Sequence, residues 1–355
     1  MLKSKFQKMP NNPSLNDLPS ISVIVPVFNE EKNLKRLLPS LARQSYPREK
    51  IEYIMIDDNS TDNTAKLAHK FGAKVFTVNT HNIGFNKRYG LKLAKNDLVY
   101  CIDADMELCS KNYFQLLVKP FLEDERIIGT FTREFALDGS RVFVKNSLLR
   151  FISYHPLQQD PLYDFLSPSI ASTIIGKGRN YYICEFNPGR IPAVGRILYR
   201  RKELLKISAY EKRAQMDLDL ESVEIVARAG FNYFAYVPKA KIRHYHAATL
   251  QLLILKRLRN LERNYLPNLD RKYYLWFDPN KKKGGLKIIF WVIYANLLIP
   301  ETIRGLIKSI YHKDIAFMWH PIVSITTTDA ILWGFLSSRI GRKFALKLLS
   351  HLFSL

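Results

Sequence analysis

Cysteine is scarce in this chain, and the few cysteines are not arranged as a site. Cys101, Cys109 and Cys184 are the only ones in 355 residues, an odd number without metal-ligand spacing. This argues against a disulfide framework and against a cysteine-ligated metal site. A reducing, cytosolic environment is therefore favoured.

Acidic residues are also few. The chain has 32 Asp and Glu against 54 Lys and Arg, a net charge of +22. From Ala240 onward, 19 basic residues stand against 6 acidic ones, a net of +13. The C-terminal third therefore favours an anionic neighbour, either phospholipid or nucleic acid.

Two further features are missing. Residues 1–20 are polar, rich in Pro and Asn, and lack the apolar core of a secretory signal, so we expect a flexible leader there. We also find no internal repeat. The length suits one large domain with an appendage.

Long apolar runs occur only near the C-terminus, and neither is a clean membrane span. Leu286–Ile299 has 14 residues before Pro300, whereas a span needs roughly 20. Ile315–Leu336 is long enough but contains His320 and Asp329, which are costly facing lipid. A basic amphipathic segment at 250–265 precedes both runs. We expect attachment to membrane lipids, either by a spanning helical hairpin or by shallow helices at the cytoplasmic face.

What the sequence does contain is a regular alternation of strands and helices. Apolar, β-branched runs at 21–27, 51–56, 74–78 and 98–102 are separated by segments with helical periodicity. This alternation predicts βαβ units and an α/β fold with a mainly parallel sheet flanked by helices.

Polar clusters follow three of these strands. Pro26–Glu30, Asp57-Asp58 and Asp103–Asp105 each stand where a strand ends. Ligands of open parallel sheets bind beyond the carboxyl ends of the strands, so the clusters are expected at one edge. Asp103 and Asp105, two residues apart, point the same way in an extended chain, and paired carboxylates suit Mg²⁺ or Mn²⁺. An isolated Asp-x-Asp is often a solvated turn, but three converging clusters favour a phosphate-binding site.

Six segments together resemble the family 2 glycosyltransferases, which have the GT-A fold and are mostly inverting. They extend from about Ser20 to His246, and their order and spacing are more specific than any one of them. The segments are SVIVPVFNEEKNL (22–34), IDDNSTDNT (56–64), NIGFNKRYGL with AKND (82–91, 94–97), CIDADMEL (101–108), MDLDLESVEIVARAGF (216–231) and YVPKAKIRHYH (236–246).

The resemblance implies a donor site for a nucleotide sugar such as a UDP-sugar or GDP-sugar. Pro26, Glu30 and one of Asp57 or Asp58 would hold the nucleoside. Arg88 would lie near the diphosphate, although Tyr89 stands where the family commonly has Asn.

The resemblance also implies a metal site. Asp103 and Asp105 would form the DXD motif that holds manganese or magnesium against the donor diphosphate, and Asp103 would also contact the donor. The family often adds a histidine from a late strand. His244 and His246 both lie there, and we expect His244 as the metal ligand with His246 on the acceptor side.

An inverting transfer needs a base on the acceptor side. The resemblance places it at Asp217, in the stretch that corresponds to the family's Glu-Asp-x-Asp-Leu, with Met216 in place of the Glu. Asp219 is the second candidate. Asp217 is also well placed to cap the following helix. Gly195 resembles the small residue that lets acceptor-side backbone approach the sugar.

These inferences combine into one expectation and two alternatives. We expect a leader (1–20), a GT-A catalytic domain (21–246, with a nucleotide-binding half at 21–108 and an acceptor-side half at 109–246), and a basic, apolar, membrane-associated region (247–355). The expected enzyme moves a sugar to a glycan or lipid-linked hydroxyl at the cytoplasmic face of the cell membrane.

A polyprenyl-phosphate glycosyl synthase is the first alternative. A nucleic-acid-binding protein is the second, and the position of its basic residues beside apolar segments counts against it.

Overall fold

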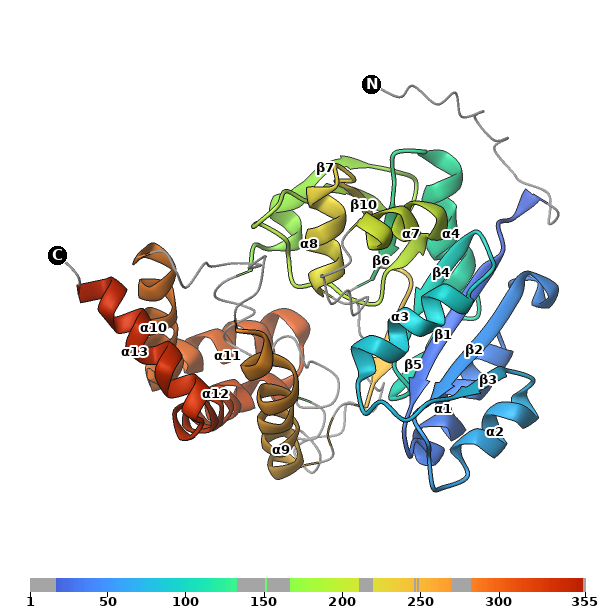
Figure 1. Cartoon of the computed structure of the whole chain (residues 1–355). Helices are drawn as coiled ribbons and strands as arrows, with labels where there is room; N and C mark the ends of the chain where they lie inside the picture. Colours follow the sequence, from blue (N-terminus) through green and yellow to red (C-terminus); the bar gives the residue numbers. More distant parts are fainter. Residues whose placement is uncertain are drawn as a thin grey trace. The chain divides into compact units, whose positions relative to one another are not determined.

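The computed structural model describes residues 17–132, 151, 167–210, 220–245, 247, 249–269 and 282–353. The chain forms two compact units. Unit 1 comprises Met1–Ala136 and Ile170–Arg243, and unit 2 comprises Leu137–Ser169 and His244–Leu355. In Figure 1, unit 1 is a sheet flanked by helices, and unit 2 is a set of helices.

Four parallel strands form one half of a nine-stranded sheet in unit 1. Their order is β3 (Lys74–Thr77), β2 (Ile51–Asp57), β1 (Ile21–Val27) and β4 (Leu98–Cys101). Every residue of β1 is buried, which explains why the strand is an almost unbroken apolar run.

The other half of the sheet is mixed. From β4 outward it continues with β9 (Leu198–Arg200), β6 (Gly129–Phe131), β10 (Tyr233–Tyr236), β8 (Tyr182–Glu185) and β7 (Ile174–Lys177). Strands β9 and β8 run antiparallel to their neighbours, so the other strands of the sheet share one direction. The predicted α/β fold with a mainly parallel sheet is confirmed.

Helices cover both faces of the sheet because alternate residues of its strands point to opposite sides. Val23 and Tyr53 belong to the same core as Leu37 of α1 and Phe114 of α4. Ile24 points the other way, toward α3, where a Cβ on Gly90 would lie 2.4 Å from its Cγ2. Only glycine allows this close approach. The helices are α1 (Glu31–Ala42), α2 (Thr64–Phe71), α3 (Ile83–Leu93), α4 (Tyr113–Glu123), α7 (Arg201–Tyr210) and α8 (Leu220–Arg228).

A separate two-stranded sheet follows the main one. It pairs β5 (Met106–Leu108) with β11 (Ile242–His244). The backbone N–H of Cys109 also donates to the carbonyl of Lys241, at 3.0 Å. This small sheet brings residues from late in the sequence beside the segment that follows Asp103.

Unit 2 is built around helix α12 (His320–Ser337), which contacts its four companion helices. These are α9 (Leu250–Asn260), α10 (Lys282–Asn296), α11 (Leu298–His312) and α13 (Arg339–Phe353). Local hydrogen bonds fix the starts of two segments: Thr249 Oγ1 accepts from the N–H of Leu252 at α9, and Asp314 accepts from the N–H of Ala316 before α12.

Candidate active site

The three predicted polar clusters do meet at one edge of the sheet. Strands β1, β2 and β4 are parallel and in register, with Val27 opposite Asp57 and Ile24 opposite Cys101. Their carboxyl ends therefore lie side by side. The N–H of Asp58 donates to the carbonyl of Val27 at 2.9 Å, which ties the first two clusters together.

Pro26 is a buried residue of β1 even though β1 lies inside the sheet. The carbonyl of Ile24 accepts from the N–H of Ile102, so the backbone groups of Ile24 point toward β4. Directions alternate along a strand, so the backbone groups of residue 26 point toward β4 as well. Strand β4 ends at Cys101, opposite Ile24. The N–H that proline lacks would therefore fall beyond the end of the ladder, where its loss costs no strand pairing.

Asp57 and Asp58 are both buried, and each fixes a loop at this edge. Asp57 Oδ1 accepts from the hydroxyl of Ser60 at 2.5 Å. Asp58 accepts from the N–H groups of Thr80 and His81, at 2.8 and 3.2 Å, and from the side-chain amide of Asn86, at 3.1 Å. Burial by itself raises the pKa of Asp58, but these donors outweigh it, so the pKa lies below its usual value.

The loops after β1 and β2 are joined by further hydrogen bonds. Asn29 donates its N–H to Ser60 Oγ, and its side chain accepts from the N–H of Thr61. The N–H of Glu30 donates to the hydroxyl of Thr64 at 2.7 Å, and its carboxylate accepts from Asn33 at 2.5 Å. The Glu30 side chain is thus held at the rim by the first turn of α1.

Lys87 is a basic residue that reaches Asp103 of the acid pair. It lies on α3 with only 2% of its side chain exposed, and its Nζ is 3.2 Å from Asp103 Oδ1. Asn82 caps the same helix by accepting from the N–H of Phe85. Arg88, one position further along, is half-buried and forms no ion pair with another described residue. That Arg88 lies near the donor diphosphate stays a prediction.

Asp103 and Asp105 occupy the turn between β4 and β5. Asp103 is 33% exposed although its Oδ1 is shielded from solvent, and Asp105 is half-buried. One oxygen of each carboxylate, Asp103 Oδ1 and Asp105 Oδ1, is shielded from solvent. Carboxylate oxygens are the ligands that Mg²⁺ and Mn²⁺ prefer. Within the described residues, no group of three His, Cys, Asp or Glu side chains is gathered for a metal. The structure therefore does not bring His244, the predicted third ligand, together with Asp103 and Asp105.

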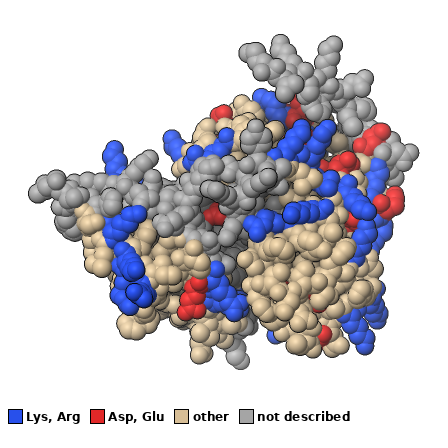
Figure 2. Space-filling model, in the orientation of Figure 1, with Lys and Arg blue, Asp and Glu red and all other residues tan. Residues whose placement is uncertain are grey.

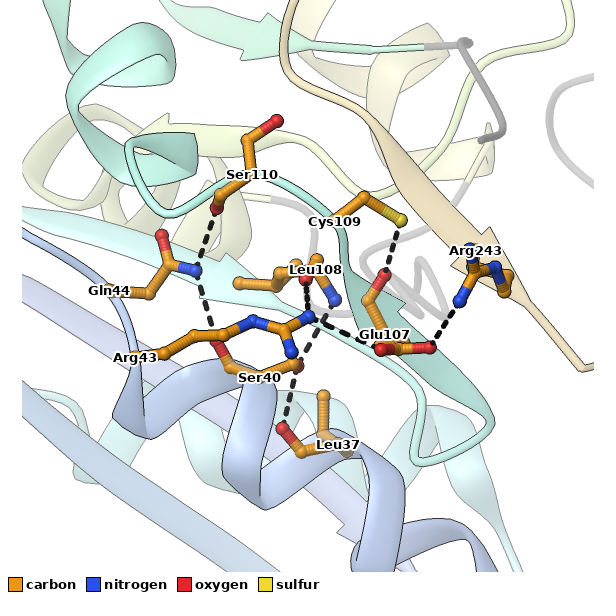
Figure 3. Close-up of polar contacts among 9 residues, drawn as sticks. All are labelled: Leu37, Ser40, Arg43, Gln44, Glu107, Leu108, Cys109, Ser110 and Arg243. Carbon is orange, nitrogen blue, oxygen red and sulfur yellow. Dashed lines mark hydrogen bonds and ion pairs between the residues drawn. The ribbon is translucent and has the colours of Figure 1, made fainter. Parts of the chain in front are cut away.

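Glu107 links this turn to its surroundings, and sequence reasoning did not single it out (Figure 3). Its carboxylate lies 3.2 Å from a nitrogen of Arg43, the residue that follows α1, and 3.0 Å from a nitrogen of Arg243 on β11. Ser40 of α1 also accepts from the N–H of Leu108. These contacts hold β5 between α1 and β11 and so fix the segment that begins two residues after Asp105.

Of the other predicted site residues, the structure describes His244 and Gly195 but not the remaining three. His244 is buried as the last residue of β11, the partner strand of β5. Gly195 is half-buried, and a Cβ on it would meet no atom within 4 Å, so close packing within the described chain does not require glycine there. Asp217, Asp219 and His246 lie outside the described residues.

Asp58 allows a test of how this edge is held together. We expect Asp58→Ala to lower the free energy of unfolding by about 1–3 kcal/mol at neutral pH, because three donors lose a buried acceptor. The lowered pKa means that the contribution of the carboxylate is complete above its unfolded pKa, near 4, and is lost as the pH falls through the folded value.

Urea unfolding at neutral and acidic pH measures this effect. The gap between wild type and Asp58→Ala should narrow on acidification. Glu49→Ala is the control, since Glu49 is exposed and makes no side-chain hydrogen bond or ion pair with the described residues. Equal losses from both variants would contradict the role given to Asp58.

Known glycosyltransferases resemble this chain in sequence. The family model for glycosyl transferase family 2 matches residues 22–177, which include the described part of the edge from Ser22 to Leu108. A 4,4'-diaponeurosporenoate glycosyltransferase of Staphylococcus haemolyticus is 37% identical over 113 residues, covering 30% of this chain and 29% of the relative. The poly(ribitol-phosphate) beta-N-acetylglucosaminyltransferase TarS of Staphylococcus aureus is 36% identical over 90 residues, covering 24% of this chain and 16% of the relative.

Among solved structures, a mannosyltransferase from Pyrobaculum calidifontis in complex with GDP-Man and Mn²⁺ covers 97% of this chain and 90% of its own, at 14% identity and a TM-score of 0.46. The chain spans less than a third of the length of the two curated relatives described above. Residues 22–177 of this chain thus match the family 2 glycosyltransferases.

Proposed function

We propose that this protein is a metal-dependent, inverting glycosyltransferase. In this proposal it moves a sugar from a nucleotide-diphosphate sugar to a hydroxyl of a glycan or lipid-linked glycan, at the cytoplasmic face of the cell membrane. The catalytic domain is residues 21–246, and residues 247–355 are the membrane-associated region. The observation that carries the proposal is the Asp103–Lys87 pair beside Asp105, at the edge where β1, β2 and β4 end.

The two charges of that pair have complementary uses toward a diphosphate. A divalent ion held by Asp103 and Asp105 would supply positive charge to the leaving nucleoside diphosphate. Lys87 neutralises Asp103 where the lysine is almost fully buried, which would reduce the repulsion between this carboxylate and a diphosphate.

The nucleoside end of the donor would lie against the neighbouring loops. Glu30 offers a carboxylate at the rim, and buried Asp57 and Asp58 hold the loops on either side in place. Carboxylate oxygens accept from the N–H and O–H groups of a base and ribose. Phe28, exposed between β1 and α1, adds an apolar surface next to this position. In this proposal these residues orient the donor, but they do not determine which nucleotide it carries.

Donor binding tests the proposal directly. Thermal unfolding should be measured with UDP, GDP, dTDP and their sugars, each with and without Mn²⁺. We expect one nucleotide to raise the melting temperature, and to do so more strongly with Mn²⁺, since a ligand that binds only the folded state stabilises it. A full series without any metal-dependent shift would contradict the proposal.

A lysine variant locates the binding site within this edge. We expect Lys87→Met to weaken donor binding by about tenfold to a hundredfold, because Asp103 would lose the cation that offsets its charge beside the diphosphate, and a hydrogen bond to a charged group contributes roughly 1.5–3 kcal/mol. Lys92→Met is the matched control, because Lys92 is exposed on the same helix. Titration calorimetry with the selected nucleotide separates the two. Equal affinities for both variants would remove Lys87 from the donor site.

A further inference from the structure

Helices α10 and α11 of unit 2 carry apolar stripes on their exposed sides. On α10, Leu286, Phe290 and Ile293 recur at spacings of four and three, so they share one side of the helix. On α11, spacings of four, four and three relate a second set of side chains. Leu297 and Leu298, both exposed, connect the two stripes at the junction. The α11 set is Ile299, Ile303, Ile307 and Ile310, and the side chains of both stripes and their junction are 48–73% exposed.

The inward side of α11 is charged. Glu301 is fully buried, and its carboxylate lies 2.7 Å from Nδ1 of His320 and 3.2 Å from a nitrogen of Arg304. Ser324 also donates to it. In water a helix is expected to turn its apolar side inward and its charges outward. Helix α11 does the reverse, which is the arrangement expected where the surroundings are lipid.

The charge of these helices favours an anionic partner. Residues 282–353 contain ten Lys and Arg and three acids. Two of the acids, Glu301 and Asp314, are buried, whereas Lys283, Lys287, Lys313 and Arg342 are exposed. In Figure 2, basic side chains also predominate over acidic ones on the visible face. Basic residues beside an apolar surface fit anionic phospholipid headgroups.

The helix lengths favour insertion into one leaflet. Helix α11 has 15 residues, and at about 1.5 Å per residue it falls short of the roughly 30 Å hydrocarbon core. Helices α10 and α11 are together long and apolar enough to cross a membrane, but they are bent by 75° at their junction and so do not form one straight span. Among the described segments, Ile315–Ser337 is long and apolar enough to cross a membrane by itself. However, 44% of its most apolar stretch is buried inside the structure, and its helix α12 contacts four other helices. It therefore serves as the core of unit 2.

We propose that the exposed face of α10 and α11 inserts into one leaflet of an anionic phospholipid bilayer without crossing it. The apolar stripes lie among the acyl chains, and the exposed lysines and arginines contact the headgroups. The buried Glu301–His320 pair keeps the polar side of α11 against α12. This inference specifies the membrane location included in the proposed function, and its test measures lipid binding rather than sugar transfer.

Vesicle flotation of the full chain provides the test. Vesicles of phosphatidylcholine alone and of phosphatidylcholine mixed with phosphatidylglycerol serve as the two probes. We expect the protein to float with the mixed vesicles and to remain bound after a high-salt wash, since inserted apolar area adds to the electrostatic attraction. The double variant Ile303→Glu with Ile307→Glu should reduce flotation at least about tenfold.

A matched control and an independent readout keep the result interpretable. Ile175→Glu changes an equally exposed isoleucine of β7 in unit 1 and should float like the wild type. Circular dichroism in detergent checks that the double variant is folded. A dye on Ile307→Cys should shift to the blue on mixing with vesicles and be quenched by lipids brominated at shallow and middle depths of one leaflet.

Several outcomes would overturn the inference. These are failure of the wild type to float with either vesicle, equal flotation of the double variant, and a dye at Ile307→Cys that vesicles leave unchanged. Self-association that the double variant abolishes, without vesicle binding, would assign the face to a second copy of the chain instead. Loss of donor binding leaves the result unaffected, so the two proposals fail separately.

Discussion

Asp103→Asn is expected to lower the rate of sugar transfer by roughly 10³-fold. A bound divalent ion contributes several kcal/mol of charge stabilisation, and each 1.4 kcal/mol or so is a factor of ten in rate. The amide keeps the shape of Asp103 but removes the charge that holds the ion. The same change at Asp105 should have a similar effect. Initial rates over a range of Mn²⁺ concentrations measure both.

The position of Lys87 makes this prediction separable from misfolding. In Asp103→Asn the lysine loses its acid partner while remaining nearly buried, so some stability should be lost. Lys87→Met combined with Asp103→Asn removes both charges and should recover that stability without recovering transfer. Asp103→Glu keeps the charge and should retain part of the metal dependence. Full activity of the Asp103→Asn, Asp105→Asn double variant would eliminate the metal site.

Asp217→Asn is expected to lower transfer to a hydroxyl acceptor by about 10²–10⁴-fold. An attacking hydroxyl must lose its proton, and a positioned carboxylate base contributes on that scale. A phosphate acceptor is already ionised, so a polyprenyl-phosphate synthase should tolerate the same change. The variant therefore distinguishes the two kinds of acceptor.

The pH dependence gives the Asp217 prediction a second readout. With a hydroxyl acceptor, the acidic limb of the kcat profile should report the base and should disappear in Asp217→Asn. Asp219→Asn is the companion variant, since Asp219 is the second candidate. Donor binding by calorimetry should be unchanged in both. If Asp219→Asn alone removed the acidic limb, the base would be reassigned to Asp219.

Local pattern was enough to predict the first half of the sheet. Strand β1 is apolar along its length because both of its faces are covered, and such a run indicates a buried parallel strand. Once the strands are parallel, Asp57 and Asp103 must follow at the same edge. The second half was not predictable in this way, because β9 and β6 pair with strands far away in the sequence.

Local sequence pattern also could not predict which basic side chain contacts Asp103. Lys87 and Arg88 are adjacent in the sequence, but neighbours on a helix point about 100° apart. Which one faces Asp103 depends on how α3 packs, and the close approach of Gly90 to Ile24 sets that packing. Glu107 was missed for a similar reason, since its partners Arg43 and Arg243 come from segments distant in sequence.

The sequence by itself determined the α/β class, the parallel strands and the acids at their ends, because strand burial and strand direction follow from local apolar pattern and short connections. Only the tertiary structure decided that Lys87 pairs with Asp103, that Glu107 joins α1 to β11, and that α11 turns Glu301 inward and its isoleucines outward. These features depend on the rotation of helices and on contacts between distant segments, which no local pattern specifies.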